Sequence, residues 1–217
     1  MDALPAGPDA VLLDFADESN PSTLVRRAAS AMRAAVDAGA LARVAEVIPA
    51  ATTLLVQFAI GSGADVLGVH RALREGAADD AEAAEAPVVE IGVHYDGADL
   101  AEVAATLGVD GAQVVAWHTG TTWRVEFMGF APGFGYLVPE SDCPLTTVGR
   151  RAEPRTRVPA GAVAVAAGYS AVYPRSSPGG WHLVGRTDRR LWDESSTPPT
   201  PLGPGTRVRF RDLAGTP

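Results

Sequence analysis

Lysine is absent from this sequence, because all 18 of its basic residues are arginine. The chain therefore has no P-loop lysine, no Schiff-base lysine and no lysine to carry biotin or lipoyl. We expect no cofactor to be attached covalently to this chain. Any phosphate or carboxylate that it binds must be held by arginine, backbone N–H groups or a metal.

Cysteine is almost absent as well, since Cys143 is the only one. A single cysteine excludes an intramolecular disulfide and a multi-cysteine metal site. The four histidines, at positions 70, 94, 118 and 182, do not stand at the spacings of a local zinc site. The GxSxG, HExxH, GxGxxG and Walker motifs are missing too. We therefore expect no metal site within this chain.

The chain also lacks an excess of positive charge and any long hydrophobic run. Its net charge of −8 disfavours binding to nucleic acid or to an anionic membrane. No apolar run approaches the roughly 18–20 residues that span a bilayer. The first ten residues are acidic and rich in proline and glycine, unlike a signal peptide. We expect a cytoplasmic, globular protein that binds neither nucleic acid nor membrane.

Charge is distributed unevenly along the sequence. Residues 1–149 contain 7 arginines and 21 acidic residues, whereas residues 150–217 contain 11 arginines and 5 acidic residues. The two segments therefore carry net charges of −14 and +6. Either this reflects chance and solvated faces, or the second segment presents arginines to an anionic substrate or an acidic partner.

Hydrophobic periodicity predicts an α+β protein that begins with a ferredoxin-like βαββαβ domain over residues 1–95. Asn20 and Pro21 read as the N-cap and first position of a helix that Gly39 ends. An acidic, alanine-rich loop is expected over 76–86. The predicted elements are a strand at 10–15, a helix at 21–38, strands at 44–48 and 52–58, a helix at 64–73 and a strand at 88–95.

The second half of the sequence differs from the first in composition and in the elements that it predicts. Residues 96–120 predict two short helices, which we interpret as a helical connector. From Thr121 onward glycine and proline are dense, and short β-rich runs predict an antiparallel barrel or sandwich over 121–217. The clearest runs are 123–127, 163–166, 181–185 and 207–210.

The segment from Phe127 to Leu137 interleaves glycine with aromatic residues. Phe130, Phe134 and Tyr136 supply flat walls for a planar ligand or a partner, while the glycines permit close backbone approach. The alternative interpretation is a barrel corner packed by aromatic rings.

Arg155 and Arg157 stand two residues apart, so an extended strand would place both on one face. Two guanidinium groups on one face can clamp a carboxylate or a phosphate. The alternative is a solvated strand edge held by salt bridges.

The segment from Tyr173 to Thr187 contains a tight turn that can expose backbone N–H groups to an anion. A barrel turn closed by a packed tryptophan is the alternative. His118 and His182 flank these motifs and are the best candidates for proton transfer. The candidate binding residues of this segment are Tyr173, Ser177, Gly179, Gly180, Trp181 and Arg186.

Three segments of the sequence resemble the KipI family, together with the closing run from Pro204 to Phe210. They are 127–137, 154–161 (which contains Arg155 and Arg157) and 173–187. Other names for the family are allophanate hydrolase subunit 1, carboxyltransferase subdomain C and D, and the B-type subunit of 5-oxoprolinase. The resemblance implies an N-terminal α/β domain followed by a cyclophilin-like β-barrel. One departure is Tyr169, where the family commonly has glutamine.

The resemblance implies a subunit of a heteromeric, ATP-dependent amide or lactam hydrolase, with 5-oxoprolinase as the leading interpretation. ATP with Mg²⁺ would act in the assembled complex. The implied partners are a KipA-like protein (allophanate hydrolase subunit 2) and a third, LamB/YcsF-like subunit. The alternatives are an allophanate hydrolase or urea-carboxylase-type carboxyltransferase subunit, and a KipI-like inhibitor of a histidine kinase.

The ligand that the resemblance implies is a small planar lactam with a carboxylate, and this ligand gives each candidate residue an expected role. Arg155, Arg157 or Arg186 would bind the carboxylate or an acyl phosphate. Phe134, Tyr173 and Trp181 would pack against the ring of the ligand. His118 or His182 would act in proton transfer.

Overall fold

The computed structural model describes residues 1–76 and 88–214, which form two compact units divided between Ala84 and Glu85. The loop expected over 76–86 lies outside the described residues from position 77 onward. Among the described helices, none has the length and apolar character needed to cross a membrane.

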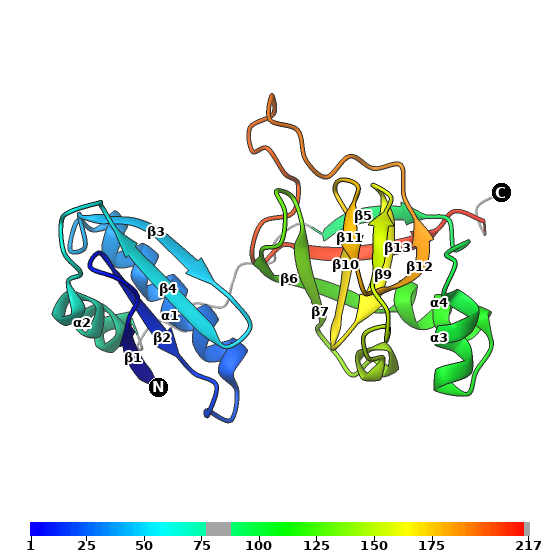
Figure 1. The fold of residues 1–217 in the computed structure, drawn as a ribbon, viewed down its shortest axis with the longest axis horizontal. Helices are drawn as coiled ribbons and strands as arrows, with labels where there is room; N and C mark the ends of the chain where they lie inside the picture. Colours follow the sequence, from blue (N-terminus) through cyan, green and yellow to red (C-terminus); the bar gives the residue numbers. More distant parts are fainter. Residues whose placement is uncertain (77–87, 215–217) are drawn as a thin grey trace. The chain divides into compact units, whose positions relative to one another are not determined.

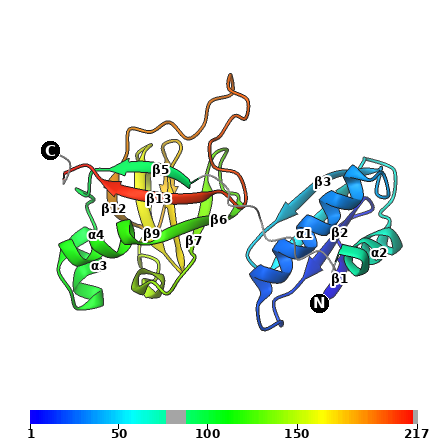
Figure 2. The same ribbon diagram turned by 180° about the vertical axis from the view of Figure 1, so that it is seen from behind.

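The first unit is an antiparallel sheet with two helices on one of its faces (Figures 1 and 2). The strand order is β1-β2-β4-β3. The helices are α1 (Pro21–Asp37) and α2 (Val66–Gly76). The strands are β1 (Asp2–Pro5), β2 (Ala10–Asp14), β3 (Val44–Pro49) and β4 (Thr53–Phe58).

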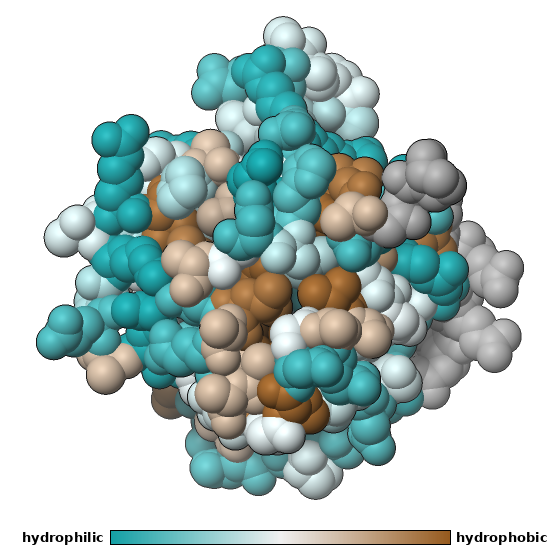
Figure 3. All heavy atoms as spheres, turned by 90° about the vertical axis from the view of Figure 1, so that its right-hand side faces the viewer, coloured by the Kyte–Doolittle hydropathy of each residue, from teal (hydrophilic) through white to brown (hydrophobic). Residues whose placement is uncertain are grey.

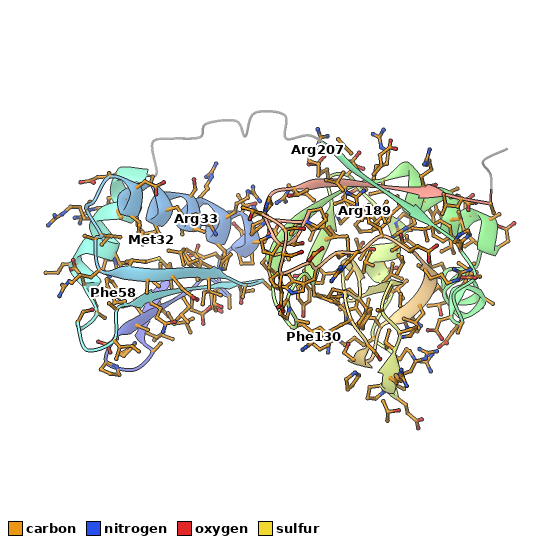
Figure 4. All side chains as sticks on the ribbon, turned by 90° about the horizontal axis from the view of Figure 1, so that it is seen from above. Met32, Arg33, Phe58, Phe130, Arg189 and Arg207 are labelled. Carbon is orange, nitrogen blue, oxygen red and sulfur yellow. The ribbon has the colours of Figure 1, made fainter. Side chains whose placement is uncertain are left out.

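The core of this unit follows from alternation in the strands and from the apolar stripe of α1. Leu54 and Phe58 point from β4 into the same layer as Met32 of α1, and all three are buried (Figure 4). Pro21 begins α1 as predicted, although the Asn20 side chain makes no capping hydrogen bond. The opposite face carries a row of apolar residues that are partners in the strand register, Leu4, Leu12, Leu55 and Ile48.

The predicted βαββαβ order of this unit is corrected by the structure. The strand expected to complete it is β5 (Val88–Val93), which pairs in parallel with β13 (Arg207–Asp212) in the second unit. The edge of β2 is occupied instead by β1. Local periodicity located these strands without specifying their partners, because pairing over a long sequence separation leaves no local pattern.

The second unit contains a seven-stranded sheet with the order β12-β9-β10-β7-β6-β13-β5. A backbone bridge between His94 and Arg186 joins its two ends, so the sheet forms a nearly closed barrel (Figure 1). Its strand pairs are antiparallel except β13 with β5. The remaining strands of this sheet are β6 (Thr122–Met128), β7 (Gly135–Pro139), β9 (Ala162–Ala166), β10 (Tyr169–Val172) and β12 (His182–Arg186).

Two helices, a short 3-10 helix and a separate ribbon complete the second unit. Helices α3 (Leu100–Leu107) and α4 (Gly111–Gly120) contribute Val103 and Val114 to the barrel core, so they are part of this unit. The ribbon pairs β8 (Arg155–Val158) with β11 (Ser177–Gly179), and the 3-10 helix is η1 (Pro144–Thr147). On the face drawn in Figure 3, hydrophobic residues gather near the middle, among hydrophilic ones.

The barrel sheet has a different character on each face. Val163, Val165 and Val172 point inward to the main core, because alternate residues of a strand face opposite ways. Ala164 and Ala171 point outward into a second cluster, which contains most of the aromatic residues singled out in the sequence. Small alanine side chains on this outer face leave room for large rings.

Candidate functional site

Seven aromatic side chains gather on the outer face of the barrel sheet, and we call them the aromatic wall. Tyr169 stacks on Trp181 with ring centroids 6.4 Å apart, and Phe134 meets Trp181 edge-on at 5.7 Å. The structure thus brings together five residues predicted from sequence, Phe130, Phe134, Tyr136, Tyr173 and Trp181. Phe127 and Tyr169 complete the wall.

Phe130 is the exposed edge of the aromatic wall. Its side chain is 57% exposed, and its ring lies edge-on to Phe134 at 5.1 Å and to Tyr173 at 6.1 Å (Figure 4). Its backbone has φ of 66°, a left-handed conformation that a bulky residue rarely adopts. Such strain persists where the surrounding structure fixes it, often at sites that bind ligands. Phe130 therefore offers a ring that is both held in place and accessible.

Three phenols provide the polar groups of the wall. Burial raises the pKa of Tyr136, Tyr169 and Tyr173 above the ordinary value for tyrosine, so all three are neutral at pH 7. Their hydroxyl groups make no hydrogen bond to any residue within the described part of the chain. Tyr136 and Tyr169 are partly exposed, so their hydroxyl groups are available as donors to a ligand carbonyl or carboxylate, whereas Tyr173 is buried.

Gly179 makes room for one of these phenols. A Cβ atom at this position would lie 2.4 Å from the Tyr173 hydroxyl oxygen, which is far inside a van der Waals contact. The adjacent Gly180 shows no such restriction, because a Cβ atom there would lie 3.6 Å from Pro154. Of the two glycines predicted as site residues, Gly179 is thus the one that packing requires.

Arg150 is a cation that the sequence interpretation missed. Its side chain is exposed and makes no hydrogen bond or ion pair with any described residue. Its positive charge opposes the effect of burial on the pKa of Tyr136 and of Tyr173, so it lies near both phenols. Its position in the arginine-rich second segment, just before the Arg155 motif, was the available signal.

Arg155 has a different role from the one predicted. Its guanidinium group makes two hydrogen bonds, of 2.6 and 2.8 Å, to the carboxylate of Asp99. Arg151 donates to the same carboxylate at 2.6 Å, and the Leu183 N–H donates at 2.7 Å. Burial would raise the pKa of Asp99, but the hydrogen bonds and positive charges of its partners outweigh it and lower the pKa. The salt-bridge alternative therefore describes Arg155.

The other predicted anion-binding groups also have partners within the chain. Arg157 is exposed on the β8–β11 ribbon and donates from Nε to the Ser176 hydroxyl at 3.2 Å. Arg186 is paired with Asp96 at 2.9 Å. The Ser177 hydroxyl is buried without a hydrogen-bond partner among the residues that the structure describes.

The prediction of proton transfer by His118 is corrected by its position. The side chain is fully buried inside the barrel, stacked on Phe210 with ring centroids 4.2 Å apart. Nδ1 bonds the Tyr95 hydroxyl at 2.7 Å, and Nε2 bonds the Ser170 hydroxyl at 2.8 Å. Burial lowers the pKa of His118 to about 3, so the ring is neutral at pH 7. Ser170 faces inward and its neighbour Tyr169 faces outward, so the sheet separates His118 from the aromatic wall.

His182 lies at the start of β12, and its ring is largely buried. Its Nδ1 is 3.9 Å from a carboxylate oxygen of Glu102 and has no hydrogen-bond partner in the described ranges. Its partner in the strand register is Val165, which points into the barrel core, so His182 lies on the face of the sheet opposite the aromatic wall. Its role in proton transfer stays a prediction.

A buried ion pair adjoins the aromatic wall at a β-bulge. The register between β6 and β7 shifts between Val125 and Phe127, and Glu126 lies in this shift. The Glu126 carboxylate is 2.7 Å from Arg124 Nη1, and its charge adds to the rise in the pKa of Tyr169. Bulges often re-aim side chains next to active sites. Sequence inspection missed this pair because alternation along an ideal strand does not predict a bulge.

The family model for the carboxyltransferase domain, subdomain C and D, matches residues 1–202. The chain belongs to this family. The aromatic wall and the Asp99 network lie within the residues that the family model matches.

Curated relatives of this family member carry the name of the B-type subunit of 5-oxoprolinase. The Bacillus subtilis protein is 34% identical over 218 residues, which cover 94% of this chain and 89% of the relative. The Escherichia coli O157:H7 protein is 47% identical over 131 residues, so that match spans only 58% of the relative's length.

Among solved structures, the crystal structure of TTHA0988 is similar with a TM-score of 0.78 and 34% sequence identity. The match covers 96% of this chain and 40% of TTHA0988. This chain therefore spans less than half the length of TTHA0988.

Proposed function

We propose that this chain is a non-autonomous subunit of an ATP-dependent 5-oxoprolinase, which opens the lactam of 5-oxoproline to give glutamate. The observation that carries the proposal is the 34% identity to the Bacillus subtilis 5-oxoprolinase subunit over nearly the full length of both chains. In the net reaction, water adds across the amide C–N bond of the ring, and ATP hydrolysis drives the opening.

The aromatic wall supports a small planar lactam as the ligand. Aromatic faces and edges suit a flat ring. The neutral hydroxyls of the partly exposed Tyr136 and Tyr169 can donate to the lactam carbonyl, which is the group that gains negative charge when water attacks. Of the two residues predicted as catalytic, His182 is the one whose Nδ1 has no hydrogen-bond partner among the described residues, so we assign proton transfer to it.

Two observations support a need for partner chains. TTHA0988 contains this unit within a longer polypeptide, which is expected if separate subunits elsewhere supply the rest. The chain also has no lysine to hold the phosphates of ATP, and no three His, Cys, Asp or Glu side chains gather among the described residues. We therefore assign nucleotide binding to groups shared with, or supplied by, a KipA-like partner and a LamB/YcsF-like third subunit.

The test is reconstitution of the complex from purified subunits. The full set should form glutamate from 5-oxoproline in step with ADP, while this chain alone should form neither product. Urea and allophanate serve as comparison substrates for the carboxyltransferase alternative. ATP-dependent turnover of urea or allophanate in place of 5-oxoproline would overturn the proposal, as would lactam opening by this chain alone without ATP.

A further inference from the structure

We infer that Arg150 is the anion-anchoring residue of the aromatic wall, and that the wall takes a small flat molecule carrying a carboxylate. The choice of 5-oxoproline as one such molecule rests on the proposed function. The site itself rests on the position of Arg150, on the absence of partners for its charge among the described residues, and on the phenols around it.

The backbone on both sides of Arg150 is fixed to the wall. The carbonyl of Val148 accepts a hydrogen bond of 2.7 Å from the Ala167 N–H, two residues before Tyr169. The N–H of Arg151 donates at 2.9 Å to the carbonyl of Gly180, which directly precedes Trp181. Arg150 thus lies between two backbone hydrogen bonds, one formed two residues before Tyr169 and the other directly before Trp181. These two rings stack on each other in the wall.

Arg150 differs from its neighbours because its charge is not neutralised by any described residue. The guanidinium groups of Arg151 and Arg155 are both directed to Asp99. Arg186 is paired with Asp96. An exposed guanidinium group on a backbone anchored next to the wall is suited to a ligand carboxylate, which it can bind through two parallel hydrogen bonds.

The phenols define the rest of the ligand. Tyr136 and Tyr173 lie near Arg150. Tyr173 is buried, whereas Tyr136 is partly exposed, and its hydroxyl group is a neutral donor without a partner in the described part of the chain. Donors beside a cation favour a molecule that presents a carbonyl next to its carboxylate. Phe130, exposed at the edge of the wall, can cover a flat ring from the side.

The experiment compares acids with neutral analogues of the same shape. Binding to the full chain, and to the reconstituted complex, is measured by titration calorimetry with 5-oxoproline against pyrrolidin-2-one and with benzoate against benzamide. We expect wild-type protein to bind each acid about tenfold or more tightly than its neutral analogue, which is the usual effect of one charge-assisted hydrogen bond.

Three variants assign this preference to one side chain. Arg150→Ala should remove the preference for the acids, and Arg150→Lys should restore little of it, because an ammonium group cannot form the two-pronged contact. Arg175→Ala is the matched control. Arg175 is also exposed and lies two residues from Tyr173, but its charge is not among those that shift the pKa of that phenol. All three variants should keep the wild-type melting temperature, since neither arginine has a partner among the described residues.

The outcomes separate this site from the proposed function. Acid preference that is lost in Arg150→Ala supports the site, even if the complex does not turn over 5-oxoproline, and in that case only the proposed function falls. Equal binding of acids and neutral analogues by wild-type protein, or unchanged acid affinity in Arg150→Ala, would overturn the site, even if 5-oxoproline turnover is normal.

Discussion

His118 illustrates how burial changes the chemistry of a single residue. Its pKa falls from 6.5 to about 3 because the charged ring would lose its hydration inside the barrel. Below pH 6.5 the His118 side chain is therefore protonated in the unfolded chain, whereas in the folded chain it stays neutral down to about pH 3. The free energy of unfolding is then highest above pH 6.5 and falls as the pH drops towards 3, by about 2 kcal/mol at pH 5.

The variant His118→Gln tests this acid sensitivity. Glutamine cannot titrate, so the variant should lose less stability than wild type between pH 7 and pH 5, although packing against Phe210 will be weaker at both. Urea denaturation at the two pH values measures the difference. Carboxylates titrate in both proteins and cancel in the comparison. An equal loss in both proteins would mean that His118 is not the group responsible.

Gly179 and Tyr173 form a second case at the residue scale. Gly179→Ala places a methyl group against the Tyr173 hydroxyl, and the buried ring has little freedom to move, so we expect a loss of about 1–3 kcal/mol. The double variant with Tyr173→Phe removes the nearest atom and should recover part of the loss. Thermal unfolding of both single variants and the double variant measures this coupling. Gly180→Ala, which meets only an ordinary contact, is the control.

The sequence predicted residue types better than residue partners. It identified the aromatic residues because glycine–aromatic interleaving is a local pattern, and the structure places those residues together. It assigned anion binding to Arg155, whose partner Asp99 stands 56 positions earlier in the chain. Nothing local distinguishes an arginine that pairs internally from one, such as Arg150, that pairs with no described residue.

At the scale of elements, Asp99 joins three parts of the barrel unit. It precedes α3, accepts from Arg155 of β8 and accepts from the Leu183 N–H of β12. Asp99→Asn would leave Arg155 without its counter-charge and Arg151 with only the exposed Glu102, so we expect a loss of about 3 kcal/mol, as for breaking a buried pair. Chemical denaturation is the measurement.

The control for Asp99 is Asp96→Asn, which breaks the exposed pair with Arg186. Both side chains of that pair are about half exposed, so the loss should stay below about 1 kcal/mol. Similar losses in the two variants would show that the Asp99 network does not hold these elements together.

The order of elements was predicted more reliably than their pairing. The strand runs near 123–127, 163–166 and 207–210 correspond to β6, β9 and β13, and the helix at 21–38 corresponds to α1. β1 was missed because four residues ending in proline carry too little alternation to indicate a strand. β5 was placed in the wrong sheet because its apolar alternation suits either neighbour equally well.

At the scale of the whole molecule, we expect this chain to form a stable complex with a KipA-like partner. The arginine-rich second segment and the family membership motivate this expectation. The two chains, expressed together, should elute as one species in size-exclusion chromatography, and raised salt should weaken the complex if charge contributes to it. Separate elution at every salt concentration would contradict the prediction, and an unrelated acidic protein of similar size is the control.

The parallel pairing of β5 with β13 has a consequence for how the chain folds as it is synthesised. The first sheet has all its strands, and helix α1, once residue 58 has emerged, and helix α2 follows soon after. The barrel is different, because β5 emerges early but its partner begins only at Arg207. Until then β5 presents an unpaired edge, a typical starting point for aggregation. Pairings of such long sequence separation also form slowly. The barrel unit should therefore depend more than the first unit on chaperones during synthesis, even though its folded core is the larger of the two.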